Sequence, residues 1–442
     1  RILTTSLASV FLLVLCNCGG SSPSPWTPPP TNPVLTSVTV APANPTLTLG
    51  AARQFTATAN YSDHTTHDVT ASASWSSATA AVATAANGSG REGVVTPRAV
   101  GSSTVTATYN SVSGSTSATV NALVPRFVLA GNYCDHTVSR LTINSSSGRL
   151  RAYGYTPVTA PCPFSLAVDP QSKFVYLASD SAPSSVWAFS TNPQSGTLTA
   201  VPGSPFGAGP NPTKLAIDAG GKFLFVTNRG DGSVSVFSIG ANGALSSVAA
   251  NVRSGRGAWA PAIDPLGKFL YVTNPLDKTV SAFSIASSGA LTAVTGSPYP
   301  TGTGAMGVVI DPSGQFLYVT NSTSSNVSAF TIKGTSGALS SVSGSPFMAG
   351  QGAGAAAIDP SGKFLIVANA ADNTASVFSI DGTTGALTAV GAPVATDESP
   401  FDVAFDPAGK FVLVSHLDTN DLGTFAFNSS TGALTPVALM SG

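Results

Sequence analysis

The stretch IDPSGQFLYVTN, from Ile310 to Asn321, decides the fold because close copies of it recur along the last two thirds of the chain. Each copy contains an aspartate near its start, and successive aspartates lie 49, 46, 47, 48 and 47 residues apart. The six aspartates are Asp169, Asp218, Asp264, Asp311, Asp359 and Asp406. A nearly constant period of this length indicates that one supersecondary unit is repeated.

Each unit is expected to fold into four antiparallel strands. In the copy quoted above, we predict an inner strand at 308–311, a second at 316–320, a third at 327–332 and a fourth starting at Leu339. Asp and Pro favour the first positions of a tight turn and Gly its last, while Phe, Leu, Tyr and Val favour a strand buried on both faces. Small residues in the inner strand fit a crowded central axis, and they include Ala216, Ala262, Ala357 and Ala404. Radial repetition of such units predicts an all-β fold with a β-propeller.

Seven blades are predicted, because the leucine that opens the fourth strand occurs seven times. These leucines are Leu150, Leu198, Leu245, Leu291, Leu339, Leu387 and Leu434. The inner strand is recognisable in only six units, and the first unit, which starts at Phe127, lacks it. The sequence stops short of a closing strand, or residues 118–123 serve as that strand, or the first blade has three strands; we favour the first explanation. The propeller is expected to span residues 126–442.

Residues 34–122 have a different pattern, with short alternating segments such as SVTVAP, FTATANY and STVTATY. Alternation with a period of two and frequent turn signals predicts a small β-sandwich. The segment resembles bacterial immunoglobulin-like domains of group 2, which implies a stalk or adhesion module without catalysis. The resemblance rests on Val38-Thr39-Val40, Pro45-Thr46-Leu47-Thr48-Leu49-Gly50, Gln54-Phe55-Thr56-Ala57, Tyr61-Ser62-Asp63, Asp68-Val69-Thr70 and Trp75.

The N-terminus predicts export. Residues 3–15 form an apolar segment behind Arg1, too short to span a bilayer and typical of a signal peptide. The segment leads into Leu15-Cys16-Asn17-Cys18, which resembles a bacterial lipoprotein signal and implies a signal peptide at 1–18 with lipidation of Cys18. An ordinary signal peptide is the alternative. Residues 19–33 then form a Ser/Pro-rich tether. The expected location is the bacterial cell envelope, with the membrane as a partner through the lipid anchor, or secretion.

The composition excludes some classes of partner. Charged residues make up 9% of the chain and the formal net charge is -1, so no basic surface for nucleic acid is expected. The 44 Gly and 32 Pro suit many turns between short strands.

The repeats resemble the YVTN-type repeats and the lactonase-like seven-bladed propellers, a family related to 6-phosphogluconolactonases. Residues 270–274 and 317–321 both read LYVTN and carry the motif, and the resemblance covers Phe127 to Gly442. The resemblance implies a propeller and, for some members, lactone hydrolysis. The repeated residues build blades, however, and fold alone does not give an activity.

Candidate ligand residues lie on the rim that the loops after the second and fourth strands share. Five second strands end in Asn, which either faces a ligand or caps its own loop by bonding the backbone; these are Asn132, Asn228, Asn274, Asn321 and Asn369. The last blade has His416 there, and Asp135 and His136 lie in the matching loop of the first blade.

The loop before the fourth blade contains Arg253, Arg256 and Trp259, which suit a carboxylate or phosphate because the guanidinium fork matches either anion. The loop into the last blade adds Asp397 and Glu398. Arginines that bind an anion, with His416 and Glu398 as catalytic proton carriers, are what lactone opening requires. The alternative is a set of solvated loop residues.

Two cysteines lie in the propeller, and we predict that Cys134 and Cys162 form a disulfide between adjacent blades. Free thiols are the alternative. His64 and His67 are assigned to a surface turn, since two histidines without a third ligand make a poor metal site. No metal or cofactor is predicted.

Taken together, these patterns favour a surface propeller on an immunoglobulin-like stalk that binds a protein or glycan at its rim. The alternative is a lactonase-like hydrolase that opens a sugar-acid lactone there.

Overall fold

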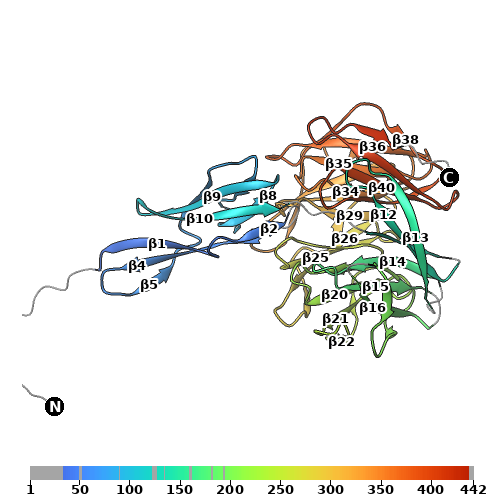
Figure 1. The fold of residues 1–442 in the computed structure, drawn as a ribbon, viewed down its shortest axis with the longest axis horizontal. Helices are drawn as coiled ribbons and strands as arrows, with labels where there is room; N and C mark the ends of the chain where they lie inside the picture. The colour runs from blue at the N-terminus through green and yellow to red at the C-terminus, as the bar shows by residue number, and fades with distance from the viewer. Residues whose placement is uncertain are drawn as a thin grey trace, which may run out of the picture.

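The computed structural model describes residues 33–48, 52–88, 90–121, 127–133, 135–158, 162–180, 183–192 and 195–437. These residues form two all-β domains, an elongated one made of the first ten strands and a ring of sheets made of the rest (Figure 1). In the described part of the chain, no helix is long and apolar enough to cross a membrane. The predicted signal peptide, Cys18 and most of the tether lie outside the described residues.

The first domain is a sandwich of three sheets with strand orders β1-β4-β5, β2-β10-β9-β6 and β3-β8-β7. Its core contains Phe55 and Trp75, and the Trp75 indole donates to the carbonyl of Thr70 at 3.0 Å. The strands are β1 (Leu35–Ala41), β2 (Thr46–Thr48), β3 (Arg53–Gln54), β4 (Thr56–Tyr61), β5 (Thr66–Asp68), β6 (Ser74–Ser77), β7 (Ala83–Ala85), β8 (Val94–Pro97), β9 (Gly101–Tyr109) and β10 (Val112–Asn121).

The second domain consists of seven antiparallel sheets in the described residues, one for each sequence unit. Blade one contains β11 (Phe127–Asn132), β12 (Thr137–Ile143) and β13 (Leu150–Pro157). Blade two contains β14 (Pro163–Val168), β15 (Phe174–Ser179), β16 (Ser185–Thr191), β17 (Leu198–Ala200) and β18 (Phe206–Gly207). Blade three contains β19 (Pro212–Ile217), β20 (Phe223–Asn228), β21 (Ser233–Ile239), β22 (Leu245–Ser247) and β23 (Val252–Arg253). Blade four contains β24 (Pro261–Ile263), β25 (Phe269–Asn274), β26 (Thr279–Ile285), β27 (Leu291–Ala293) and β28 (Tyr299–Pro300).

Blades five and six have the same plan, and blade seven has four strands. Blade five contains β29 (Ala305–Ile310), β30 (Phe316–Asn321), β31 (Asn326–Ile332), β32 (Leu339–Ser341) and β33 (Phe347–Met348). Blade six contains β34 (Ala353–Ile358), β35 (Phe364–Asn369), β36 (Thr374–Ile380), β37 (Leu387–Ala389) and β38 (Val394–Ala395). Blade seven contains β39 (Pro400–Phe405), β40 (Phe411–His416), β41 (Leu422–Phe427) and β42 (Leu434–Pro436). The outer edge differs from the prediction, because two short strands such as β32 and β33 both pair with the third strand.

Blade one has three strands in the described part of the chain, in the order β11-β12-β13. The suggestion that residues 118–123 supply its inner strand was wrong for residues 118–121. These belong to β10, where Ala118 pairs with Ser103 of the first domain.

A glycine in the turn after the third strand of each blade closes the ring of blades. The glycine packs on the phenylalanine that opens the second strand of the preceding blade, and blade one completes the circle by packing on blade seven. A Cβ atom on any of these glycines would lie within 2.3–2.9 Å of the aromatic ring. All seven have a positive φ, so both space and conformation favour glycine. The pairs are Gly148–Phe411, Gly196–Phe127, Gly243–Phe174, Gly289–Phe223, Gly337–Phe269, Gly385–Phe316 and Gly432–Phe364.

The YVTN motif joins neighbouring blades. In blade five, the fully buried Tyr318 donates its hydroxyl to the carbonyl of Gly385 in blade six at 2.9 Å, and Thr320 donates to the carbonyl of Gly354. Tyr271 makes the matching bond to Gly337. Burial raises the pKa of both tyrosines above its usual range, which keeps them neutral donors. The motif therefore builds the interface between blades.

Tyr318→Phe is expected to destabilise the propeller by about 1–2 kcal/mol, because the buried Gly385 carbonyl loses its partner. Thermal denaturation followed by circular dichroism measures this. The control is Tyr299→Phe, since that hydroxyl bonds Thr295 near the surface and its loss should cost much less. Equal effects of both changes would contradict the assigned role.

The aspartate of the repeat organises the turn between the inner and second strands. Asp311 Oδ1 accepts from the backbone amides of Gln315 at 2.8 Å and Phe316 at 2.7 Å, and Oδ2 accepts from Ser313 at 3.0 Å. A buried carboxylate satisfied by several amides explains why the residue recurs.

The first domain is attached to the ring at these turns. Arg91 is 3% exposed and donates to the carbonyls of Ser313, at 2.7 Å, and Gly314 in blade five. Arg98 donates to the carbonyl of Ser361 in blade six. Burial lowers the pKa of Arg91, while the charges of Asp264 and Asp311 oppose that shift. The two domains are thus joined at the face of the ring that carries the aspartate turns.

Candidate functional site

A cavity of about 490 Å³ opens at the other end of the inner strands. Part of its wall comes from blades five and six and consists of small residues, including Gly307, Gly352 and Gly354. The lining also includes Trp259, Phe401, Lys214 and Asp402. A concave, mostly apolar space with a few polar groups is the usual form of a small-ligand site.

Aromatic rings from four blades form a cluster around Phe164. The Phe164 ring centroid lies 5.6 Å from that of Trp259 and 6.0 Å from that of Phe401, and both contacts are edge-to-face. Tyr133 contacts Phe164 from blade one at 6.0 Å, and the Arg229 guanidinium lies 5.8 Å from the Trp259 ring centroid. Such a cluster offers flat apolar faces to a ligand at the cavity.

One ion pair crosses this part of the channel. Lys214 Nζ of blade three lies 2.5 Å from Asp402 Oδ2 of blade seven, and 5.4 Å from the centroid of the Phe401 ring. The lysine side chain is 17% exposed and the aspartate side chain 53%, so the carboxylate stays accessible. Among the described residues, these two are the charged groups that line the cavity.

Lys214, Asp402, Phe164 and Phe401 were missed by the sequence prediction, although a signal for them exists. The residue five positions before the repeat aspartate differs between blades two to seven. It is, in order, Phe164, Thr213, Trp259, Met306, Gly354 and Phe401. Four positions before the aspartate, the same blades carry Ser165, Lys214, Ala260, Gly307, Ala355 and Asp402. The copies differ at both positions, so the inner strand varies as well as the rim loops.

The predicted arginine loop does not line the cavity. Arg253 and Arg256 are exposed, and Arg256 Nε pairs with Asp277 Oδ1 at 2.6 Å. Hydrogen bonds from Arg256 lower the pKa of Asp277, so the pair is ionised. Trp259 is the residue of this loop that reaches the cavity.

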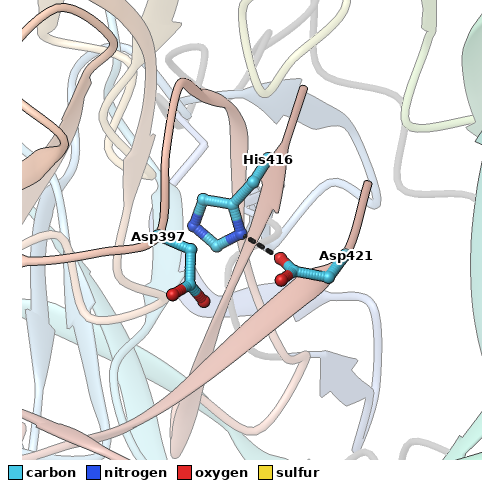
Figure 2. Close-up of side chains that lie close together, drawn as sticks. All are labelled: Asp397, His416 and Asp421. Carbon is cyan, nitrogen blue, oxygen red and sulfur yellow. Dashed lines mark hydrogen bonds and ion pairs between the residues drawn. The ribbon is translucent and has the colours of Figure 1, made fainter. Parts of the chain in front are cut away.

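The predicted proton carriers lie in blade seven, also outside the cavity lining. Glu398 is exposed. His416 is buried and its Nδ1 lies 2.6 Å from Asp421 Oδ1, with Asp397 beside the ring (Figure 2). The structure therefore does not gather Arg253, Arg256, Glu398 and His416 around one cavity.

The asparagines that end the second strands are structural. Asn228, Asn274, Asn321 and Asn369 are fully buried, which excludes a ring that faces a ligand. The expected backbone cap needs correction, because the amide donates mainly to side chains of the third strand. Asn369 Nδ2, for example, lies 3.0 Å from Thr374 Oγ1 and 2.9 Å from Ser376 Oγ.

The remaining candidates lie in or near blade one. Asp135 and His136 are exposed. Cys162 has a free thiol in this structure, and Cys134 lies outside the described residues, so the disulfide stays a prediction. His64 and His67 lie at the surface of the first domain, where His67 packs on Tyr61 with ring centroids 5.4 Å apart.

A second cavity of about 410 Å³ lies at the opposite mouth of the channel. It is lined by apolar residues of the inner strands and the aspartate turns, such as Ile310, Pro312 and Pro360. Without charged groups, it offers little chemistry.

Comparison with known proteins gives two family matches. The model described as lactonase, 7-bladed beta-propeller matches residues 101–214 and 127–440. The model of the bacterial Ig-like domain (group 2) matches residues 34–120. Both resemblances expected from the sequence, and the all-β fold, are confirmed.

Several solved structures resemble the ring. A putative 6-phosphogluconolactonase from Bacteroides fragilis has a TM-score of 0.63 and 25% identity, covering 70% of this chain and 92% of that one. The periplasmic gluconolactonase of Pseudomonas aeruginosa has a TM-score of 0.63 and 22% identity, covering 72% and 97%. The ice-binding protein 1 of Shewanella frigidimarina is 34% identical over 158 residues, which are 31% of this chain but only 18% of that protein.

Proposed function

Because the chain belongs to the lactonase family of seven-bladed β-propellers, we propose that it binds a sugar-acid lactone in the channel cavity and opens the ring by hydrolysis. The observation that carries this proposal is the Lys214–Asp402 pair inside an aromatic cavity. The cavity, of about 490 Å³, has room for one sugar ring. Trp259 and Phe401 offer apolar faces for the C–H groups of that ring.

The two charged groups suit the two needs of lactone opening. Asp402 accepts a proton from a water molecule, whose oxygen then attacks the carbonyl carbon. Lys214 stabilises the negative charge that develops on the carbonyl oxygen. The bond from the carbonyl carbon to the ring oxygen then breaks, and the ring oxygen takes up the proton that Asp402 accepted and becomes a hydroxyl. A carboxylate that is half exposed and fixed by a lysine is accessible to both water and ligand.

Asp402→Asn is expected to lower kcat/KM for lactone hydrolysis by about 10²-fold or more, the usual loss when a general base is removed. Lys214→Met should also lower it, through loss of the electrostatic contribution. The assay follows acid release from gluconic acid δ-lactone and its 6-phosphate, with the buffer rate subtracted. Lys268→Met, a change of an exposed lysine in the turn between β24 and β25, is the control and should not affect the rate. A wild-type rate equal to the buffer rate would contradict the hydrolase proposal.

A second candidate is a binding platform without catalysis. The observation in its favour is the outer strand β13, where Tyr153 and Tyr155 are 51% and 65% exposed. Exposed tyrosines with Arg140 beside the Tyr153 ring are common at binding surfaces. Specific binding of a glycan or protein by a chain that does not open lactones would favour this function. Anchoring at the cell envelope through Cys18 is part of both proposals.

A further inference from the structure

Blade seven departs from the other blades at three positions that act together. In the five blades whose second strand ends in Asn, the amide donates to side-chain oxygens five and seven residues further on. Blade seven has His416 at the first position, Asp421 at the second and Gly423 at the third. In blade seven, an imidazole thus replaces the amide, a carboxylate replaces the first side-chain oxygen, and a residue without a side chain replaces the second.

These replacements fit one another in space. The Asp421 carboxylate takes the place of the first side-chain oxygen, and its Oδ1 lies 2.6 Å from His416 Nδ1. At Gly423 a Cβ atom would lie 2.9 Å from His416 Cε1, so glycine leaves space for the larger ring. The imidazole is completely buried, with a side-chain exposure of 0%.

The other ring nitrogen has no partner. His416 Nε2 is buried and makes no hydrogen bond in the described part of the chain. A proton on Nδ1 serves the Asp421 carboxylate, which leaves a lone pair on Nε2. A buried lone pair without a donor is costly, so something that accepts its electrons is expected there.

Asp397 lies beside the ring and completes the cluster. Figure 2 shows it near the edge of the imidazole that carries Nε2, with Asp421 at the opposite edge. Asp397, His416 and Asp421 can each offer one ligand atom such that all three atoms lie within 4.8 Å of one another. In a tetrahedral zinc site with bonds of about 2.0–2.2 Å, two ligand atoms lie about 3.3–3.6 Å apart, so the carboxylates would have to move inward when an ion binds. Asp397 is exposed, so its carboxylate has space to move toward the ring.

We propose that His416 and Asp397 bind a zinc-class divalent ion in blade seven, with Asp421 as the residue that orients the imidazole. Two protein ligands alone make a weak zinc site; the buried and unpartnered Nε2 of His416 is what distinguishes this pair from His64 and His67. A carboxylate–histidine–metal arrangement of this kind fixes the ring and makes the nitrogen a better ligand. An imidazole ligand favours zinc over Ca²⁺ and Mg²⁺, which prefer oxygen ligands. Because Asp397 is exposed, water would supply the remaining ligands from the side of that carboxylate. These residues do not line the channel cavity, so the proposal is independent of lactone hydrolysis.

The test titrates ZnCl₂ into the chelator-treated full chain without an affinity tag, by isothermal calorimetry, and records the absorption of bound Co²⁺. The wild type should bind one equivalent more than His416→Asn does. Asn is the residue that five other blades carry at this position, so this variant is expected to fold. Zinc should also raise the melting temperature of the wild type, because an ion that binds only the folded state stabilises it.

Matched variants separate the site from other zinc-binding groups, such as the cysteines and the remaining histidines. Asp397→Asn should weaken the site at least tenfold, whereas Glu398→Gln, an equal change of charge at the next residue, should leave it unchanged. Equal zinc stoichiometry and affinity in the wild type and in His416→Asn would overturn the proposal. The same holds if Asp397→Asn and Glu398→Gln weaken binding equally.

Discussion

Gly385→Ala is expected to destabilise the propeller by about 2–4 kcal/mol. The φ of Gly385 is 74°, a conformation that alanine adopts at a cost, and the new Cβ would lie 2.3 Å from Cδ1 of Phe316. Phe316 is 3% exposed and packed in the core between blades five and six, so it has little space to move. The same turn bonds Tyr318 through the Gly385 carbonyl, and a shift of the backbone would weaken that bond as well.

Gly382 supplies the control within the same turn. A Cβ atom there meets nothing within 4 Å, and its φ is not in the left-handed region. Gly382→Ala should therefore leave the stability nearly unchanged. Differential scanning calorimetry of the two variants gives the comparison. If Gly385→Ala melted within a degree of Gly382→Ala, the close packing of glycine on phenylalanine would not limit stability.

Arg91→Met should weaken the docking of the immunoglobulin-like domain by about 2–4 kcal/mol. The methionine keeps part of the apolar stem but donates to neither Ser313 nor Gly314, and it leaves two carbonyls of a tight turn without their partner. Hydrogen bonds from a charged donor are among the stronger ones, and this donor is 3% exposed. The expected result is a calorimetric transition of the first domain that separates from that of the propeller and falls to a lower temperature.

Arg53→Met is the comparison, because Arg53 is exposed on β3 of the same domain. It removes the same charge without touching the ring. Small-angle scattering adds a second measurement, since loss of docking broadens the distribution of distances between the domains. Unchanged transitions and scattering in Arg91→Met would show that docking does not depend on this arginine.

Much of the fold could be predicted because the repeat contains both the residues that form each turn and the residues that contact the next blade. Asp311 specifies the turn through its bonds to backbone amides, and Tyr318 specifies the neighbouring blade. The extra strand at the outer edge of blades two to six, such as β33, could not be predicted, because two residues give no periodic pattern.

The site was less predictable, because a residue in the channel looks like any other residue of a strand. Lys214 and Asp402 lie 188 positions apart, and only closure of the ring brings them together. The charge of the arginine loop suggested an anion site, yet Arg256 forms an ion pair with Asp277 at the surface. The sequence showed that His416 replaces an asparagine. The contacts that Asp421 and Gly423 make with its ring are visible only in the structure.

The attachment of the first domain to the aspartate turns has a mechanical consequence. Load applied at the N-terminal side of the first domain passes into blades five and six through Arg91 and Arg98, in parallel with the covalent link between the domains. The channel mouth that contains Lys214 and Asp402 is at the far end of the inner strands from that attachment. A chain held at its N-terminus would therefore present this mouth on the side away from the attachment.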